Sequence, residues 1–480
     1  MTQHQLVRAT VARSVRLQEA LHARALRGKI LPRALVITAG ACVSSSARIE
    51  RASRWMLNPT RLDNRPRIAR TDDTREQRRM TEPAPDRAPI ERLLAEPILK
   101  HTRAWAAINS GTNNLAGLTA MAGALADAFA VLPGDITLVD PAPTQSIGVD
   151  GTLASIPHGQ HLVVRVREQA TVRMLLTGHM DTVYPVDHPF QAQRFLDGNT
   201  LNGPGVADMK GGLALMLAAL KAVEESPLAS RIGYDVLINS DEETGSFSSC
   251  ALIAEMARNK VAALTYEPAL ADGTLAGARG GTGNFSLVVH GKAAHAGRNP
   301  ADGRNAIVAA SDLAVHLFAA REEGLAVNPA RIDGGGPNNV VPDLAILRIN
   351  FRPSSSEAIA RAQAAIDAAI VEIAAIHDVR IELHGTFNRP PKPIDQQAAK
   401  LFAVVKQAGA ELGLDIGWRA TGGVCDGNNI AACGVAVVDT MGVRGGAIHS
   451  SEEYLLVDSL TERAALSALT ILRIAEKGGL

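Results

Sequence analysis

The chain has 480 residues, enough for two hydrophobic cores, and its composition is that of an ordinary globular protein, with 46% hydrophobic and 20% charged residues. The net charge is zero but unevenly spread: residues 1–80 carry 17 Lys and Arg against 6 Asp and Glu, and the remainder carries 32 basic against 43 acidic residues. A mildly acidic body argues against nucleic-acid binding as the main function.

Residues 1–80 are arginine-rich and lack regular apolar periodicity after Ala41, which predicts a basic, disordered extension. Two other interpretations stay open. Translation could start at Met80, from which a short lead runs into a helix. The apolar residues 34–43 suggest secretion or lipid attachment, although they lie far from Met1 and no leucine stands three residues before Cys42.

From residue 88 onward, helical and strand patterns alternate. Helical spacing covers 88–131, with an asparagine cap near Asn113, and a further helix is expected from Asp208 onward, with Leu213, Met216, Leu217, Leu220 and Val223 on one stripe. Strands are predicted at 162–166, 173–177, 234–239 and 262–266, a loop at 187–198 and a helix at 247–258. This alternation predicts an α/β fold whose mostly parallel, mixed sheet lies between helices.

The glycine-rich run GARGGTG (277–283) leads into a strand rather than a helix, which argues against a nucleotide loop and favours a hinge. Beyond it the predicted order is strand, helix, strand, strand, helix, strand, which is the ferredoxin-like unit. A second hinge, NRPPKP (388–393), closes this insertion. The predicted domains are therefore an extension (1–80), a catalytic domain in two parts (88–280 and 390–480) and an inserted dimerisation or lid domain (281–389). The last part is predicted to contain helices at 396–412, 428–432 and 458–476 and strands at 415–420 and 434–440.

Acidic and imidazole side chains follow the predicted strands, where an α/β sheet gathers its chemistry. Each alone has an ordinary explanation, such as a helix cap at Asp208, a capping pair at Glu242–Glu243 or a loop histidine at His449. Together they offer the nitrogen and carboxylate ligands that a two-zinc hydrolytic site needs, with Glu242 left off the metal as the proton carrier. The candidate ligands are His179, Asp208, Glu243, Glu267 and His449.

Five segments, GHMDTV, GPGVADMKGG, NSDEETGS, YEP and GGAIHSSEEY, resemble the co-catalytic di-zinc aminoacylase/carboxypeptidase family of metallopeptidases over about residues 88–480. The family includes glutamate carboxypeptidase, acetylornithine deacetylase and succinyl-diaminopimelate desuccinylase. DEETGSFSS, GKAAHAG and NNVVPD are most similar to the glutamate carboxypeptidase branch.

The resemblance implies that His179 and Glu267 bind one Zn²⁺, Glu243 and His449 the other, and Asp208 both. Asp181 would orient His179, and the peptide after Asp208 would be cis. Glu242 would take a proton from the metal-bridging water and deliver it to the leaving amine. Co²⁺ or Mn²⁺ would suit the same ligands.

The inserted domain would complete the site in a homodimer. His295 resembles the histidine that reaches across the dimer to the scissile carbonyl, and Asn339 and Arg352 match substrate-binding positions, with Arg352 suited to a carboxylate. For His295 and Arg352, a surface histidine and a surface salt bridge are the ordinary alternatives. Val424 and Cys425 depart from the family's glycine and small polar residue, and valine disfavours a positive φ, so this loop is expected to be reshaped.

The predicted function is zinc-dependent cleavage of the amide of N-acyl amino acids or C-terminal, glutamate-type residues. A deacetylase or desuccinylase of a biosynthetic intermediate is the alternative, and a non-catalytic binding protein is the rival from another class. Cysteine catalysis at Cys425 is disfavoured because no base is assigned to it. The sparse cysteines (42, 250, 425 and 433), without any Cys-x-x-Cys pair, favour a cytoplasmic protein, and no apolar run reaches the length of a membrane span.

Overall fold

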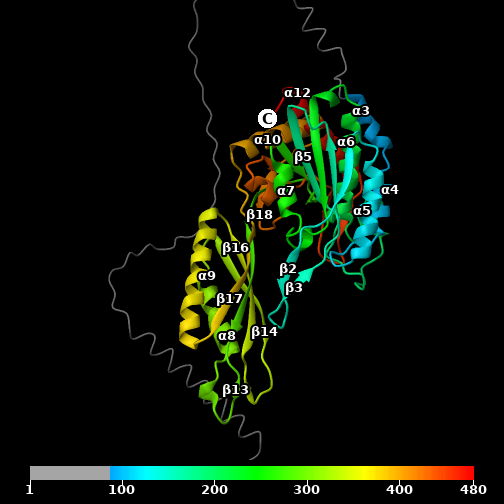
Figure 1. Ribbon diagram of the computed structural model, residues 1–480. Coiled ribbons are helices and arrows are strands. Elements are labelled where there is room, and N and C mark those ends of the chain that lie inside the picture. The colour runs from blue at the N-terminus through cyan, green and yellow to red at the C-terminus, as the bar shows by residue number, and fades with distance from the viewer. Residues whose placement is uncertain (1–86) are drawn as a thin grey trace, which may run out of the picture. The chain divides into compact units, whose positions relative to one another are not determined.

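The structure is a computed structural model that describes residues 87–480 (Figure 1). The expectations for residues 1–80, and the role of Cys42, lie outside the described residues. Within the described part, none of the helices is both long and apolar enough to cross a membrane.

A six-stranded sheet carries the predicted strand-end residues. Its order is β1 (Asp135–Val139), β4 (His161–Val166), β8 (Ile232–Asn239), β5 (Val172–His179), β9 (Ala262–Thr265) and β19 (Val437–Val438). The β1–β4 and β4–β8 pairs are antiparallel, and the β8–β5, β5–β9 and β9–β19 pairs are parallel. The sheet is therefore mixed, and its parallel strands end at one edge.

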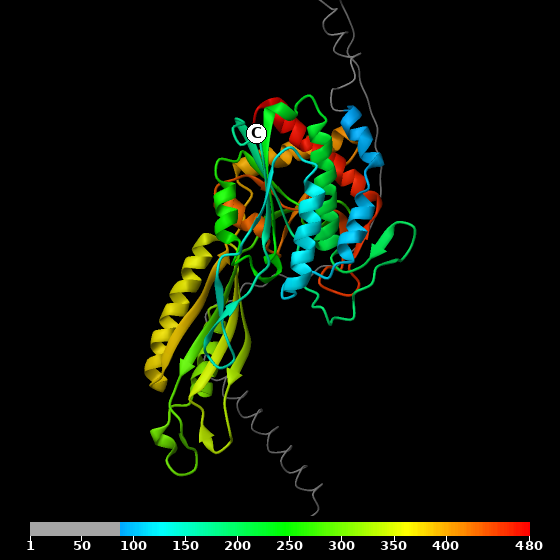
Figure 2. The same ribbon diagram turned by 45° about the vertical axis from the view of Figure 1, so that its right-hand side comes forward.

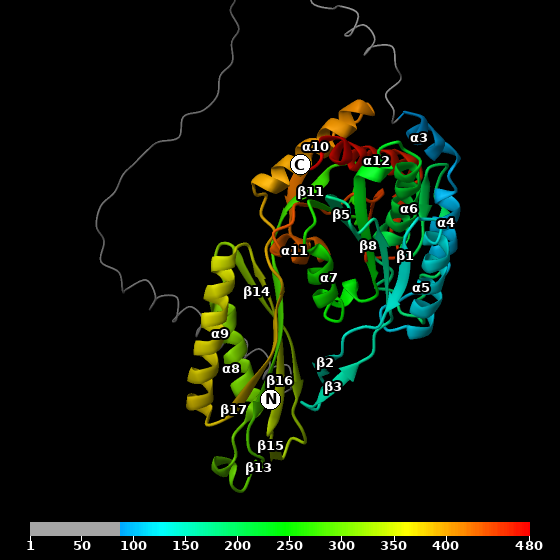
Figure 3. The same cartoon turned by 45° about the horizontal axis from the view of Figure 1, so that its top comes forward.

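Helices cover both faces of this sheet (Figure 3). Along β4, Leu162, Val164 and Val166 enter one core, while Val163 enters the other, as the two-residue period of a strand requires. The first core is closed by α3 (Arg87–Arg92), α4 (Ile98–Ala106), α5 (Leu115–Phe129), α6 (Gly211–Glu224), α10 (Gln396–Glu411) and α12 (Asp458–Lys477). The second is closed by α7 (Cys250–Ala257) and α11 (Asp426–Ala432).

The insertion has a core of its own. Its strands β12 (Thr282–His290), β14 (Leu325–Gly334), β16 (Leu344–Pro353) and β17 (Arg380–Arg389) form an antiparallel sheet in the order β14-β16-β12-β17. Two helices, α8 (Ala306–Ala319) and α9 (Ser356–His377), pack on one face (Figure 2), and their apolar residues share one cluster with the strands. At the end away from the six-stranded sheet lie the short strands β13 (Ala294–His295) and β15 (Val340–Val341).

A hairpin that the sequence patterns did not predict lies against this inserted sheet. Its strands are β2 (Thr144–Ile147) and β3 (Leu153–Ile156). Ile147 packs with Val288 and Ile346, and Arg348 Nη2 donates to the carbonyl oxygen of Ile147 at 2.9 Å. Most hairpin residues are exposed, so the segment lacks the apolar alternation that marks a strand.

Shorter elements complete the catalytic part. A five-stranded sheet runs in the order β10 (Ala269–Leu270), β20 (Arg444–Gly446), β21 (Tyr454–Leu456), β7 (Thr200–Asn202) and β6 (Arg194–Phe195), and β11 (Leu275–Arg279) pairs with β18 (Trp418–Thr421). Single-turn helices occur at η1 (Leu93–Ala95), η2 (Val206–Lys210), η3 (Ala229–Arg231), η4 (Glu242–Thr244) and η5 (Pro300–Asp302).

Three local predictions were wrong. The helix expected from Asp208 begins at Gly211, because Asp208 and Met209 have non-helical backbone angles. The peptide bond between these two residues is cis, as the resemblance implied. The predicted loop 187–198 contains β6. The strand expected at 434–440 is only two residues long, since that segment pairs with β9 at Val437 and Val438 alone.

Candidate metal centre

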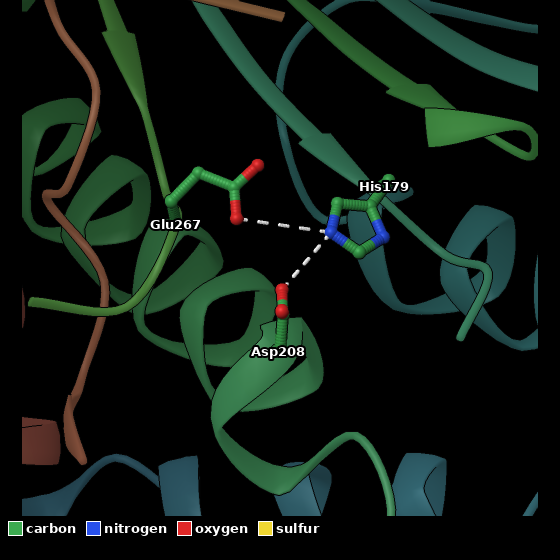
Figure 4. A group of neighbouring side chains, drawn as sticks. All are labelled: His179, Asp208 and Glu267. Atoms are coloured by element: carbon green, nitrogen blue, oxygen red, sulfur yellow. Dashed lines mark hydrogen bonds and ion pairs between the residues drawn. The ribbon is translucent and has the colours of Figure 1, made fainter. Parts of the chain in front are cut away.

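Three of the predicted residues, carried by different segments of the chain, meet in the fold (Figure 4). His179 is the last residue of β5, Asp208 lies in η2, and Glu267 follows β9. His179 Nε2 lies 3.2 Å from Asp208 Oδ1 and 3.8 Å from Glu267 Oε2. All three side chains are buried, so this is an enclosed cluster of one imidazole and two carboxylates.

A second cluster shares the aspartate. His449 Nε2 lies 3.3 Å from Asp208 Oδ2 and 3.3 Å from Glu243 Oε2. The two carboxylate oxygens of Asp208 therefore face two different imidazoles. In each cluster, the three atoms that could bind a metal lie within 4.8 Å of one another.

The other ring nitrogen of His179 faces Asp181. Nδ1 lies 3.0 Å from the carbonyl oxygen of Asp181 and 3.3 Å from its Oδ1. The Asp181 carboxylate also accepts hydrogen bonds from the backbone N–H groups of Glu242 and Glu243, both at 3.2 Å, and from Thr112. Asp181 thus ties the loop after β5 to the loop that carries the two glutamates.

Glu453 positions the Asp208 loop, and sequence reasoning missed it. Its buried carboxylate accepts hydrogen bonds from the backbone N–H groups of Gly205, Ala207 and Asp208 at 2.9–3.0 Å. Tyr184 donates its hydroxyl to the same carboxylate at 2.8 Å. The only signal in the sequence was its place four residues after His449, in HSSEEY.

The charge of the two clusters fits divalent cations. Burial, together with the charge of Asp208, raises the pKa of Glu243 to about 8, and burial also raises the pKa of Glu267. Hydrogen bonds to Asp208 and Glu243 raise the pKa of His449 to about 10. Several buried carboxylates at such short range retain protons unless cations offset their charge, and a metal can replace those protons. Imidazole nitrogen and carboxylate oxygen are donors that Zn²⁺, Co²⁺ and Mn²⁺ accept.

Glu242 lies beside the clusters and outside both of them. Burial raises the pKa of Glu242 to about 7, although Arg389 opposes the shift. A value near neutrality suits a group that takes up and releases a proton. Glu242 also lines a cavity of about 700 Å³, together with Asp208, Glu243, Glu267 and His449.

The inserted domain contributes one predicted residue to this cavity and keeps two away from it. Arg352, on β16, is among the lining residues. His295, on β13, is exposed and accepts hydrogen bonds from its own loop, and the carbonyl oxygen of Asn339 pairs with the N–H of Ala296. His295 and Asn339 therefore lie together at the far end of the insertion and do not line the cavity of their own chain.

The loop with Val424 and Cys425 also lines the cavity. Val424 does not have a positive φ, and the expected reshaping of this loop stays a prediction. Cys425 is buried and precedes α11, and burial raises the pKa of its thiol well above the usual value. A protonated thiol is a poor nucleophile.

An α/β sheet with a cavity and two carboxylate–imidazole clusters beyond the ends of its parallel strands is typical of a metal-dependent hydrolase. Residues 175–473 match the model of peptidase family M20/M25/M40, and the chain belongs to this family. It is accordingly a hydrolase of amide bonds, as the sequence motifs predicted.

Relatives agree with this assignment, and solved structures share the fold. Carboxypeptidase G2 of Pseudomonas sp. (strain RS-16) is 30% identical over 327 residues, which cover 66% of this chain and 78% of the relative. Succinyl-diaminopimelate desuccinylase of Verminephrobacter eiseniae (strain EF01-2) is 27% identical over 314 residues, 61% of this chain and 76% of the relative. The aminopeptidase PepT structure from Bacillus cereus ATCC 10987 has a TM-score of 0.60 at 22% identity and covers 80% of this chain and 99% of that one. The structure of the Bacillus subtilis YXEP protein is described as a dinuclear metal-binding peptidase of the M20 family. It has a TM-score of 0.56 at 16% identity, and the match covers 81% of this chain and 99% of that one.

Proposed function

We propose that the chain is a dinuclear zinc hydrolase in which Asp208 is shared by the two ions. His179 and Glu267 would complete one site, and Glu243 and His449 the other. The observation that carries the proposal is that Oδ1 of Asp208 faces His179 while its Oδ2 faces His449. Zinc is preferred for these donors, and Co²⁺ or Mn²⁺ would substitute for it.

Two divalent cations held there would polarise the scissile carbonyl and lower the pKa of the attacking water. Glu242 takes a proton from that water while the water oxygen forms a bond to the carbonyl carbon. Glu242 then gives the proton to the amide nitrogen as the carbon–nitrogen bond breaks. The products are a carboxylate and a free amine, so one water is consumed for each amide.

The substrate class follows from the cavity's cationic lining. Arg352 reaches the cavity, and no carboxylate forms an ion pair with it within residues 87–480. A guanidinium can bind a carboxylate through two parallel hydrogen bonds. We therefore propose N-acyl amino acids and peptides with a C-terminal, glutamate-type residue as substrates, a choice that the similarity to carboxypeptidase G2 supports. The desuccinylase relatives keep removal of a succinyl or acetyl group as the alternative.

Replacing Arg352 with alanine is expected to raise KM about 10- to 100-fold for N-acyl glutamates, since a charge-assisted pair contributes about 1.5–3 kcal/mol. Arg331→Ala is a matched control, because Arg331 is an exposed arginine of the neighbouring strand β14 that pairs with Asp333. Steady-state kinetics on a panel of N-acetyl, N-succinyl and longer N-acyl amino acids also identifies the preferred acyl group. An unchanged KM in the Arg352 variant on every substrate would refute the assigned role.

We also propose a homodimer in which His295 and Asn339 serve the partner's cavity. Both residues are remote from the cavity of their own chain, and the helices of the insertion expose apolar side chains that a second copy could cover. These side chains are Val308, Val315, Phe318, Val371 and Ile376.

Light scattering should give twice the mass of one chain. Mixing two inactive variants tests directly whether His295 of one chain serves the cavity of the other. When Glu242→Ala and His295→Ala chains are refolded together, random pairing should restore about one quarter of wild-type activity, because mixed dimers contain one intact site. A monomer in solution, or no recovery of activity in confirmed mixed dimers, would overturn this arrangement.

A further inference from the structure

Arg389 enters the catalytic site from the inserted domain. It is the last residue of β17, at the second predicted hinge, and the residue is only 5% exposed. Its Nη2 lies 2.8 Å from Glu242 Oε1 and also donates to the carbonyl oxygen of Glu242 at 2.8 Å. One guanidinium nitrogen thus holds both the side chain and the backbone of Glu242.

This contact leaves the two carboxylate oxygens of Glu242 in different situations. Oε1 is engaged by Arg389, whereas Oε2 has neither a hydrogen bond nor an ion pair with any residue in 87–480, and Glu242 lines the cavity. The backbone of Glu242 is fixed from the other side, because its N–H donates to Asp181 Oδ1 at 3.2 Å. One oxygen is therefore fixed and the other is available to a proton in the cavity, which is the arrangement that a positioned acid–base group needs.

The anchor is itself held in place. Arg389 Nη2 donates to Ser246 Oγ at 2.9 Å and lies 3.5 Å from Asp426 Oδ1. Asp426 in turn accepts a hydrogen bond from Asn239 at the end of β8. Arg279, the other strongly buried arginine of the cavity, forms its ion pair with Asp439 and makes no contact with Glu242, so the anchoring contact is specific to Arg389.

We infer that Arg389 is a positioning residue for Glu242: it fixes Oε1 and thereby presents Oε2 to the reacting water and amine. The inference rests on the proposed role of Glu242. It makes the geometry of a catalytic-domain side chain depend on the last residue of the inserted sheet. Arg389 is a positioning residue rather than a catalytic one, because its contacts are with Glu242, Ser246 and Asp426.

The test compares Arg389→Met and Arg389→Lys with the wild-type holoenzyme on one N-acyl amino acid that it hydrolyses. The methionine variant should lower kcat about 10- to 100-fold with KM changed by less than about 3-fold, because the base is misplaced while substrate binding is kept. Lysine keeps the positive charge but lacks the planar guanidinium group. The kcat of Arg389→Lys should therefore lie between those of Arg389→Met and the wild-type enzyme. Metal content by mass spectrometry should stay at the wild-type value in both. Arg173→Met is the control, because it removes a partly buried arginine–aspartate ion pair outside the site. Arg173 pairs with Asp235 and lies at the end of β5 opposite to His179.

A double variant separates positioning from other roles. If Arg389 acts through Glu242, adding Arg389→Met to Glu242→Ala should change the residual kcat by less than about 2-fold. Three results would each overturn the inference. They are an equal loss of kcat from Arg389→Met with and without Glu242, a raised KM with unchanged kcat, and full activity in Arg389→Met. If Glu242→Ala itself stays active, the proposed function fails rather than this inference alone. If the methionine variant does not fold, the lysine variant decides by the same criteria.

Discussion

Replacing Glu242 with alanine is expected to lower kcat by about 10²- to 10⁴-fold, the range for loss of a general acid–base group, while both metal ions remain bound. Glu242 belongs to neither metal cluster, so the ligands are untouched. Its carboxylate is buried beside the clusters and lines the cavity. KM should change little, because Glu242 acts in proton transfer and not in binding the substrate.

Single-turnover kinetics and metal analysis of the same preparation measure this effect. Glu452→Ala is a suitable control, because Glu452 is an exposed acid in the loop after His449 and its side chain contacts neither cluster. Glu242→Asp should retain a small part of the activity, since the shorter side chain keeps the carboxylate but withdraws it. A Glu242→Ala enzyme with both metals and wild-type kcat would contradict the mechanism.

Replacing Asp208 with alanine is expected to abolish metal binding at both positions and activity with it. Asp208 is the only residue common to the two clusters among residues 87–480, and each of its oxygens faces a different histidine. Metal affinity should fall by more than about 100-fold, since even residues that only orient ligands cost 10- to 100-fold when lost. Activity should fall to that of the chelated wild-type protein.

Metal-to-protein ratios after gel filtration distinguish Asp208 from residues that belong to one cluster. Glu267→Ala and Glu243→Ala should each lose about one metal ion, because each removes a ligand from a single cluster. Circular dichroism should show the same secondary structure in all three variants. An Asp208→Ala protein that retains two ions per chain would refute the shared role of this aspartate.

The sequence was most informative where function depends on strand ends. The strand predicted at 173–177 lies within β5, which is buried along most of its length, and His179, expected just past the strand, is the last residue of β5. The alternation of strands and helices likewise predicted the sheet that brings Glu267 close to His179. Glu243 and His449, also among the five candidate ligands, lie far from each other in the chain, and the fold brings His449 Nε2 within 3.3 Å of Glu243 Oε2.

What could not be predicted depends on contacts between distant segments. Glu453 reaches backbone N–H groups more than 240 residues earlier in the chain, and Arg389 meets Glu242 from 147 residues away. Neither contact leaves a local pattern, because the partners are main-chain groups or a single carboxylate. The backbone around Asp208 was also mistaken for a regular helix start, since its apolar spacing continues into α6.

The most direct test of a two-metal amide hydrolase is to titrate the chelated, metal-free chain with Zn²⁺ while following hydrolysis of an N-acyl amino acid. Activity should be absent at the start, rise with added metal and reach a plateau at about two equivalents per chain, because the two clusters share one aspartate and act on one substrate. Full activity in the metal-free protein, or a folded protein that binds no metal, would contradict the account.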